Sequence, residues 1–186
     1  MARPRDYRPL CKLACALGLA VLASTACGAS GSAVSSTPTA APKPAGATPS
    51  AISKMVCSKE AQHDLAATLG VTATVGAPTW ADHRYSCRYA YPDGSFTLSV
   101  KELSSKAETD AYFDMLRQQL GDTGIVNGVG QGAFNTLDGS IVARKDWKVL
   151  LVDVSALPAQ FGVPPTKSAD VAFTVADVIM ACWRGD

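Results

Sequence analysis

The sequence contains few of the residues that enzymes use most often as catalysts or metal ligands. It has two histidines among 186 residues, His63 and His83, and neither lies in a His-x-x-x-His pair or a Cys/His cluster of the kind that binds zinc. No serine lies in the Gly-x-Ser-x-Gly elbow of a hydrolase. We therefore predict that the protein is not an enzyme and has no catalytic residue, no metal site and no cofactor.

The chain also lacks an excess of positive charge. Its 17 lysines and arginines are balanced by 16 aspartates and glutamates. Four of the basic residues and one of the acidic residues precede Cys27, so the remainder carries 13 basic and 15 acidic side chains. A slightly acidic protein has no electrostatic footprint for nucleic acid and no polybasic patch for anionic lipid. We therefore predict that nucleic acid is not a partner.

Long apolar runs are absent too, since a helix that spans a bilayer needs about 20 apolar residues. The first apolar run, Leu13 to Ala26, is shorter, follows a basic opening and leads directly into Cys27. This pattern predicts an export signal over residues 1–26 and a lipid on Cys27 that anchors the protein to the outer face of the cell membrane. Ser24 stands where a bacterial lipobox usually has leucine, and signal cleavage without lipidation is the alternative.

Acidic residues are missing from residues 27–54, which consist mainly of Ala, Ser, Thr, Pro and Gly. Such a segment has too little apolar surface to offset the entropy lost on ordering, so we expect a disordered linker after the lipidated cysteine. The remaining residues, 55–186, are long enough to bury a core of their own and should form one globular domain.

The pattern of residues 55–186 predicts an α+β fold in the order α-β-β-β-α-β-β-β-β-α, with antiparallel strands and helices on one face of the sheet. Alternating residues over 84–91, a Pro92-Asp93-Gly94 turn and a second alternating run predict a β-hairpin. Ser58 and Gly70 should cap the first helix. The other helices are expected over 105–120 and 168–183, and the other strands over 71–77, 124–127, 132–136, 140–145 and 148–155.

The middle helix should begin with a capping box formed by Ser105 and Glu108. Its spacing predicts a buried face of Tyr112, Met115, Leu116 and Leu120. The last helix should bury one stripe composed of Val171, Val175, Val178, Ile179 and Cys182.

Three cysteines lie in the predicted domain: Cys57, Cys87 and Cys182. Exported proteins meet an oxidising environment that favours disulfides. We predict a structural Cys57–Cys87 bond, with Cys57–Cys182 as the alternative. A redox role would favour a Cys-x-x-Cys pair, which the sequence lacks.

Several features of the domain occur together in one known family. They are Cys57 before the first helix, Ser86-Cys87-Arg88-Tyr89 in a strand, the Gly-rich run 128–134 and a strand pair before a C-terminal helix. In these features the chain resembles the small actinobacterial lipoproteins grouped as a domain of unknown function. Gln131 departs from that family, whose Gly-rich turn often carries acidic residues. The resemblance implies a location and a fold type, and it supplies no catalytic residue.

One strand is the candidate surface for a partner. Arg84 and Arg88 share a face of that strand, Trp80 lies just upstream, and arginines and aromatics are enriched in binding hot spots. The alternative is that the tyrosines of the strand cover the core and the arginines are simply solvated. Gly128-x-Gly130-x-Gly132 has neither the spacing nor the following helix of a dinucleotide loop, and we expect a turn that needs positive φ.

The functional hypothesis is a non-enzymatic, lipid-anchored envelope protein that binds an envelope protein or lipid, or assists envelope sensing. The alternative is a carrier of a small apolar ligand or lipid, with its pocket between helix and sheet.

Overall fold

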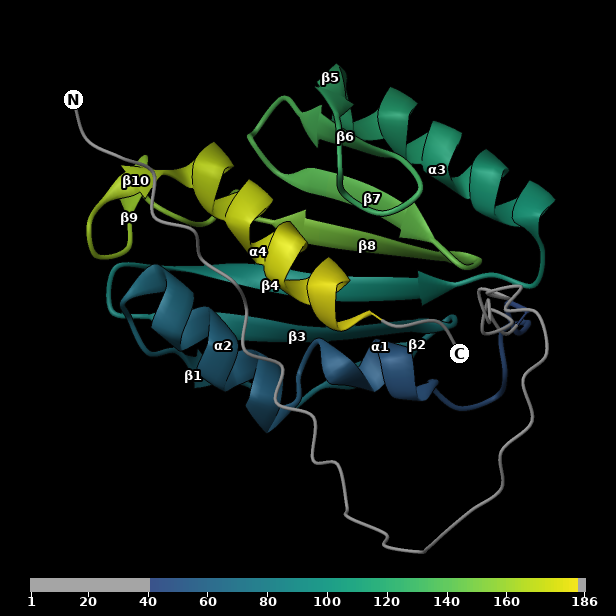
Figure 1. Cartoon of the computed structure of the whole chain (residues 1–186), viewed down its shortest axis with the longest axis horizontal. Coiled ribbons are helices and arrows are strands. Elements are labelled where there is room, and N and C mark those ends of the chain that lie inside the picture. The colour runs from purple at the N-terminus through teal and green to yellow at the C-terminus, as the bar shows by residue number, and fades with distance from the viewer. Residues whose placement is uncertain (1–40, 184–186) are drawn as a thin grey trace, which may run out of the picture. The chain divides into compact units, whose positions relative to one another are not determined.

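The computed structural model describes residues 41–183. These residues form an antiparallel sheet of eight strands with helices packed on it (Figure 1), which confirms the predicted α+β class. The expected signal and Cys27 lie outside the described residues. The elements are α1 (Ala51–Met55), α2 (Lys59–Leu69), β1 (Thr74–Val75), β2 (Thr79–Ala81), β3 (Arg84–Tyr91), β4 (Gly94–Glu102), α3 (Lys106–Leu120), β5 (Asp122–Val126), β6 (Ala133–Thr136), β7 (Ile141–Lys145), β8 (Lys148–Asp153), β9 (Gln160–Phe161), β10 (Thr166–Lys167) and α4 (Ser168–Cys182).

The strand order of the main sheet is β1-β3-β4-β8-β7-β6-β5. The short strand β2 pairs with residues 84–86 of β3, and β1 pairs with residues 89–90 of that strand. Tyr91 lies opposite Gly94, so the predicted β3–β4 hairpin is confirmed with Pro92 and Asp93 as its two-residue turn. The central pair is β4 and β8, which are far apart in the chain and place Leu98 opposite Val152.

One face of the sheet is covered by α2 and α4. Cross-strand neighbours on this face are fully buried, as in the row Leu98, Val152 and Ile141 across β4, β8 and β7. Leu65 of α2 and Val175 of α4 are buried against them in the same core. This face therefore holds the main hydrophobic core of the described residues.

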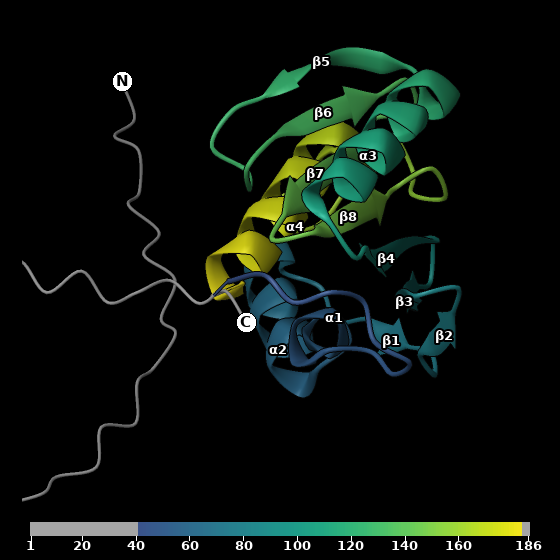
Figure 2. The same ribbon diagram turned by 90° about the vertical axis from the view of Figure 1, so that its right-hand side faces the viewer.

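The prediction that the helices lie on one face of the sheet is wrong, because α3 packs on the opposite face (Figure 2). There it covers β6, β7 and β8 with a separate, smaller cluster. No described helix covers this face over β3. The chain crosses the sheet from β4 to the edge strand β5 through α3, and this helix could have packed on either face of the sheet. The sequence pattern of neighbouring residues does not specify which face it takes. The buried members of the smaller cluster are Phe113, Leu116, Phe134, Val142 and Val149.

The buried side of α3 also differs from the prediction. Thr109, Phe113 and Leu116 are buried, whereas Met115 is 36% exposed and Tyr112 is only partly buried. The helix offers two overlapping apolar stripes, and the edge-to-face contact of Phe113 with Phe134, with ring centroids 5.1 Å apart, selects one of them. That contact joins residues remote in the chain, so the helical period alone did not identify it.

The cap predictions for α2 are confirmed. The Ser58 hydroxyl accepts a hydrogen bond from the Ala61 amide at 3.1 Å, and Gly70 ends the helix with φ +68°. A Cβ atom at Gly70 would lie 2.3 Å from the Val163 carbonyl oxygen. Glycine is therefore required both by the backbone conformation and by this close approach.

Ordered structure begins earlier than residue 55. The Ala45 amide donates to the Leu103 carbonyl at 3.1 Å, and the Ser50 amide donates to a Glu102 carboxylate oxygen at 2.8 Å at the start of α1. The last part of the predicted linker is thus fixed along the end of the sheet. The strand expected over 71–77 is also shorter, because only Thr74–Val75 pairs with β3, and β2 was not predicted.

Candidate functional site

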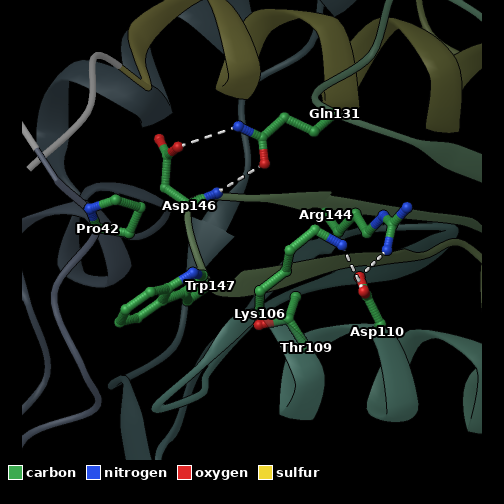
Figure 3. A pocket seen from close by; sticks show the side chains of 8 residues that line it. All are labelled: Pro42, Lys106, Thr109, Asp110, Gln131, Arg144, Asp146 and Trp147. Carbon is green, nitrogen blue, oxygen red and sulfur yellow. Dashed lines mark hydrogen bonds and ion pairs between the residues drawn. The ribbon is translucent and has the colours of Figure 1, made fainter. Parts of the chain in front are cut away.

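A pocket of about 360 Å³ opens between the N-terminal end of α3, the Gly-rich loop before β6 and the β7–β8 turn (Figure 3). This volume falls in the range of small-ligand sites. Charged and polar side chains predominate in its wall, together with one indole ring. The lining residues are Pro42, Lys106, Thr109, Asp110, Gln131, Arg144, Asp146 and Trp147.

The predicted start of α3 places two of these side chains. Ser105 caps the helix by accepting from the Glu108 amide at 3.2 Å, so Lys106 and Asp110 lie one turn apart on the same side. The Glu108 carboxylate departs from the predicted box, because it accepts from the Ser104 amide at 2.8 Å and not from that of Ser105.

Asp110 is the centre of a charged triad. Lys106 Nζ lies 2.5 Å from one Asp110 oxygen, and Arg144 Nη1 of β7 contacts the other. The hydrogen bond from Lys106 is the main cause that lowers the pKa of Asp110, with the positive charge of Arg144 acting in the same direction. The carboxyl is therefore ionised at neutral pH. The Arg144 guanidinium carbon also lies 5.0 Å from the Phe113 ring centroid, which helps to fix it.

The Gly-rich loop forms the second wall. The backbone N–H of Gln131 donates to the Arg144 carbonyl at 2.8 Å, and the backbone N–H of Arg144 donates to the Gly132 carbonyl at 2.9 Å. A Cβ at Gly130, where φ is +59°, would lie 2.6 Å from the Arg144 carbonyl oxygen. The expectation of a turn that needs positive φ is confirmed, and the loop serves to bring Gln131 beside β7.

The β7–β8 turn forms the third wall. Lys145 pairs with Lys148, which leaves Asp146 and Trp147 as a two-residue turn with φ of 49° and 58°. Two positive φ values identify a type I′ turn, which favours Asn-Gly or Asp-Gly. A bulky residue such as Trp147 is strained in this conformation. The turn is held by paired hydrogen bonds, since Gln131 Nε2 donates to Asp146 and the Asp146 amide donates to Gln131 Oε1, both at 3.3 Å.

The charged side chains of the pocket balance one another. Lys106 and Arg144 offset Asp110 and Asp146, so the four ionised side chains sum to zero. Within residues 41–183 no group of three or more histidine, cysteine, aspartate or glutamate side chains is placed to hold a metal ion. Sequence reasoning missed this pocket because its ion pair joins residues 34 positions apart. The only local signal was the Asp146-Trp147 turn between two alternating strands.

The predicted disulfide is confirmed. Cys57 and Cys87 are bonded with their Cα atoms 5.9 Å apart, and Cys182 is not part of a disulfide. The bond ties the segment before α2 to the middle of β3. Tyr89, two residues along, donates its hydroxyl to the Val56 carbonyl at 2.7 Å, and burial raises the pKa of this hydroxyl and keeps it protonated.

Trp80, Arg84 and Arg88 do not form one surface. Trp80 lies opposite Tyr85, on the face that α2 covers, whereas Arg84 and Arg88 point to the other face. The Trp80 indole donates to the Ala47 carbonyl at 3.0 Å, so it fixes the segment before α1. The physical reason for the error is the pleat of β2, whose register with β3 turns the indole away from the arginines.

The two arginines lie on the uncovered part of the α3 face. Both side chains are exposed, and neither guanidinium hydrogen-bonds to another residue of the described domain. Arg84 also lines a pocket of about 300 Å³ beside α3, together with its cross-strand neighbour Lys101 and with Tyr112. The tyrosines of β3 do cover the core, since Tyr89 is buried and Tyr85 packs against it.

Comparisons with protein-family models, with curated proteins and with solved structures gave no match to this chain. In the part of the chain that the structure describes, every helix is too short or too polar to cross a bilayer.

Proposed function

We propose that the protein is an exported, lipid-anchored envelope protein without catalytic activity, and that it binds an envelope partner or assists envelope sensing. The observation that carries the binding role is the uncovered sheet face beside α3, where Arg84 and Arg88 are exposed without ion-pair partners among residues 41–183. Arginine presents five donors to a partner and is enriched in binding hot spots. The basic and apolar opening that ends at Cys27 supports the anchor.

The Cys57–Cys87 disulfide supports an extracytoplasmic location, because disulfides persist mainly in oxidising compartments. The carrier hypothesis gains no comparable support. The carrier hypothesis places an apolar ligand between α4 and the sheet. That space is filled by buried side chains such as Val175, Ile179 and Leu150. Lipid that co-purifies with the protein would favour the carrier.

The anchor is tested by the intact mass of the protein extracted from membranes, with and without reductant. We expect a mass that starts at Cys27 and includes acyl chains, and that gains two hydrogens on reduction of the disulfide. A mass without acyl chains would contradict the anchor.

The binding face is tested by cross-linking in intact cells and identification of the captured envelope protein. Arg84→Gln with Arg88→Gln should abolish capture. The matched control, Lys54→Gln with Lys167→Gln, removes two exposed charges elsewhere and should leave capture unchanged. Equal capture by both double variants would exclude the arginine face.

A further inference from the structure

The pocket at the N-terminal end of α3 lies apart from the arginines of β3 and differs from them in charge. Two cations and two carboxylates line it, and each is already paired: Lys106 and Arg144 with Asp110, and Asp146 with Gln131. An anionic ligand would have to compete with Asp110 for the same cations. A cationic ligand would meet the opposite obstacle at Arg144. The balance therefore favours a ligand that is neutral and polar.

The paired side chains retain hydrogen-bonding capacity of both kinds. Lys106 and Arg144 have further N–H donors beyond those directed at Asp110, and the Asp146 oxygen that does not accept from Gln131 is an acceptor. Figure 3 shows the two cations converging on Asp110 and the Gln131 amide directed at Asp146. Donors and acceptors are both present within one small pocket, which suits hydroxyl groups, since each hydroxyl both donates and accepts.

Trp147 supplies the remaining element, an aromatic ring at the pocket wall. It occupies a φ of 58° that glycine would adopt without strain. Residues in such conformations persist where the surroundings impose them, and they cluster at binding sites. The backbone that carries the indole is fixed on both sides of the turn, because the Trp147 carbonyl accepts from the Leu103 amide at 2.9 Å and the Asp146 amide donates to Gln131 Oε1. An aromatic ring on a fixed backbone loses less conformational entropy on binding than one on a mobile loop.

We infer that this pocket binds a neutral saccharide. The apolar C–H face of a pyranose or furanose ring packs on the Trp147 indole, and its hydroxyls bridge Arg144, Lys106 and Asp146. The pocket volume of about 360 Å³ lies within the range of small-ligand sites. This inference goes beyond the proposed function, because it uses residues outside the arginine face and holds with or without a lipid on Cys27.

The test is titration of the mature chain with a panel of neutral probes: N-acetylglucosamine, chitobiose, mannose, galactose and arabinose. Binding is followed by saturation-transfer NMR and by calorimetry. We expect at least one probe to bind in the millimolar range or more tightly. We also expect its affinity to remain unchanged as ionic strength rises from about 0.01 to about 1 M, because screening acts on charges. Failure of the whole panel, or a strong loss with salt, would overturn the inference.

The decisive variant is Trp147→Gly. It removes the ring and creates Asp-Gly, the favoured sequence for a type I′ turn, so the urea midpoint should stay equal or rise while affinity falls at least tenfold. Trp147→Phe keeps an aromatic face and should retain most of the affinity.

His83→Gly is the matched control. It changes the second residue of the other type I′ turn, Asp82-His83, where His83 has φ of 55° and lies outside the pocket wall. It should leave saccharide affinity unchanged, because the Ala45 and Ala47 hydrogen bonds still hold the neighbouring segment. Wild-type affinity in Trp147→Gly, or equal losses in both glycine variants, would also overturn the inference. None of these outcomes depends on lipidation or on the β3 arginines, so the inference and the proposed function fail separately.

Discussion

The two faces of the sheet bury very different amounts of side chain. The face under α2 and α4 carries the main core, with Leu98, Leu150 and Val152 fully buried. The face under α3 has a five-residue cluster, and beyond it the sheet exposes Arg84 and Arg88. The first face can therefore supply most of the stability, while the second keeps charged groups accessible. Two type I′ turns also differ in role, one structural and one at the candidate binding site. Asp82-His83 holds the chain before α1, and Asp146-Trp147 borders the pocket.

Removal of the disulfide should give the largest loss and would test whether the α2 side dominates stability. The bond closes a loop with a sequence separation of 30 residues, and the entropy model assigns it about 3–4 kcal/mol. We expect Cys57→Ala with Cys87→Ala to lower the free energy of unfolding by about that amount in urea denaturation. Cys182→Ala is the control and should change it little. A loss below about 1 kcal/mol would contradict the prediction.

Matched leucine truncations compare the two faces directly. Leu98 has no exposed surface, whereas Leu116 of α3 is 8% exposed in the smaller cluster. Leu98→Ala should cost about 3–4 kcal/mol and Leu116→Ala about 2 kcal/mol, since the cost grows with the cavity that remains. Urea unfolding of the two variants provides the measurement. Equal losses would show that the faces contribute alike.

Acid should lower the free energy of unfolding through the protonation of Asp110 and Asp138. Burial acts to raise the pKa of Asp138, but hydrogen bonds from Thr136 and Ser140 outweigh it and lower the pKa. The pKa of Asp110 is lowered as well. A carboxyl with a lower pKa in the folded state stabilises fully above its unfolded pKa, near 3.8, and loses this effect as the pH falls through the folded pKa.

Asp138→Asn should therefore be less stable than the wild type at neutral pH and should lose less stability on acidification. Urea midpoints at neutral pH and at about pH 3 measure both effects. Because Asp138 lies in the β6–β7 turn, its variant should affect stability and leave the pocket intact. An unchanged acid response in Asp138→Asn would contradict the role of this carboxyl.

The smallest effect on stability is expected on the open face. Arg84→Gln with Arg88→Gln should change the free energy of unfolding by less than about 0.5 kcal/mol, because neither guanidinium has a partner to lose within the described domain. Thermal or urea unfolding of the double variant provides the check. A large loss of unfolding free energy would assign these arginines a structural role, and would contradict the prediction that the open face contributes little to stability.

The local features of the fold were predictable because each depends on neighbours in the chain. Ser58 and Gly70 bracket α2, the Pro92-Asp93 turn sets the β3–β4 hairpin, and the Gly-rich run forms a turn. The failures share a different cause. Met115 and Phe113 lie on overlapping helical stripes, and the exposed one was predicted to be buried because only the contact with Phe134 distinguishes them.

The candidate pocket could not be predicted for the same reason. Asp110 and Arg144 come from α3 and β7, and Gln131 and Asp146 come from two loops 15 residues apart. Residue type gave no hint of these pairings, because lone charged residues on helices and strands are usually solvated. The grouping of Trp80 with Arg84 and Arg88 failed through one register relation between β2 and β3.

The sequence by itself determined the α+β class, the β3–β4 hairpin and the caps of α2, because side-chain period and turn chemistry act over a few residues. Only the tertiary structure decided which face each helix covers, which of the open cysteine pairings is formed and which charged side chains meet. Those choices depend on strand order and on how the chain crosses the sheet, and they bring together Asp110 and Arg144 although nothing near either residue in the chain specifies its partner.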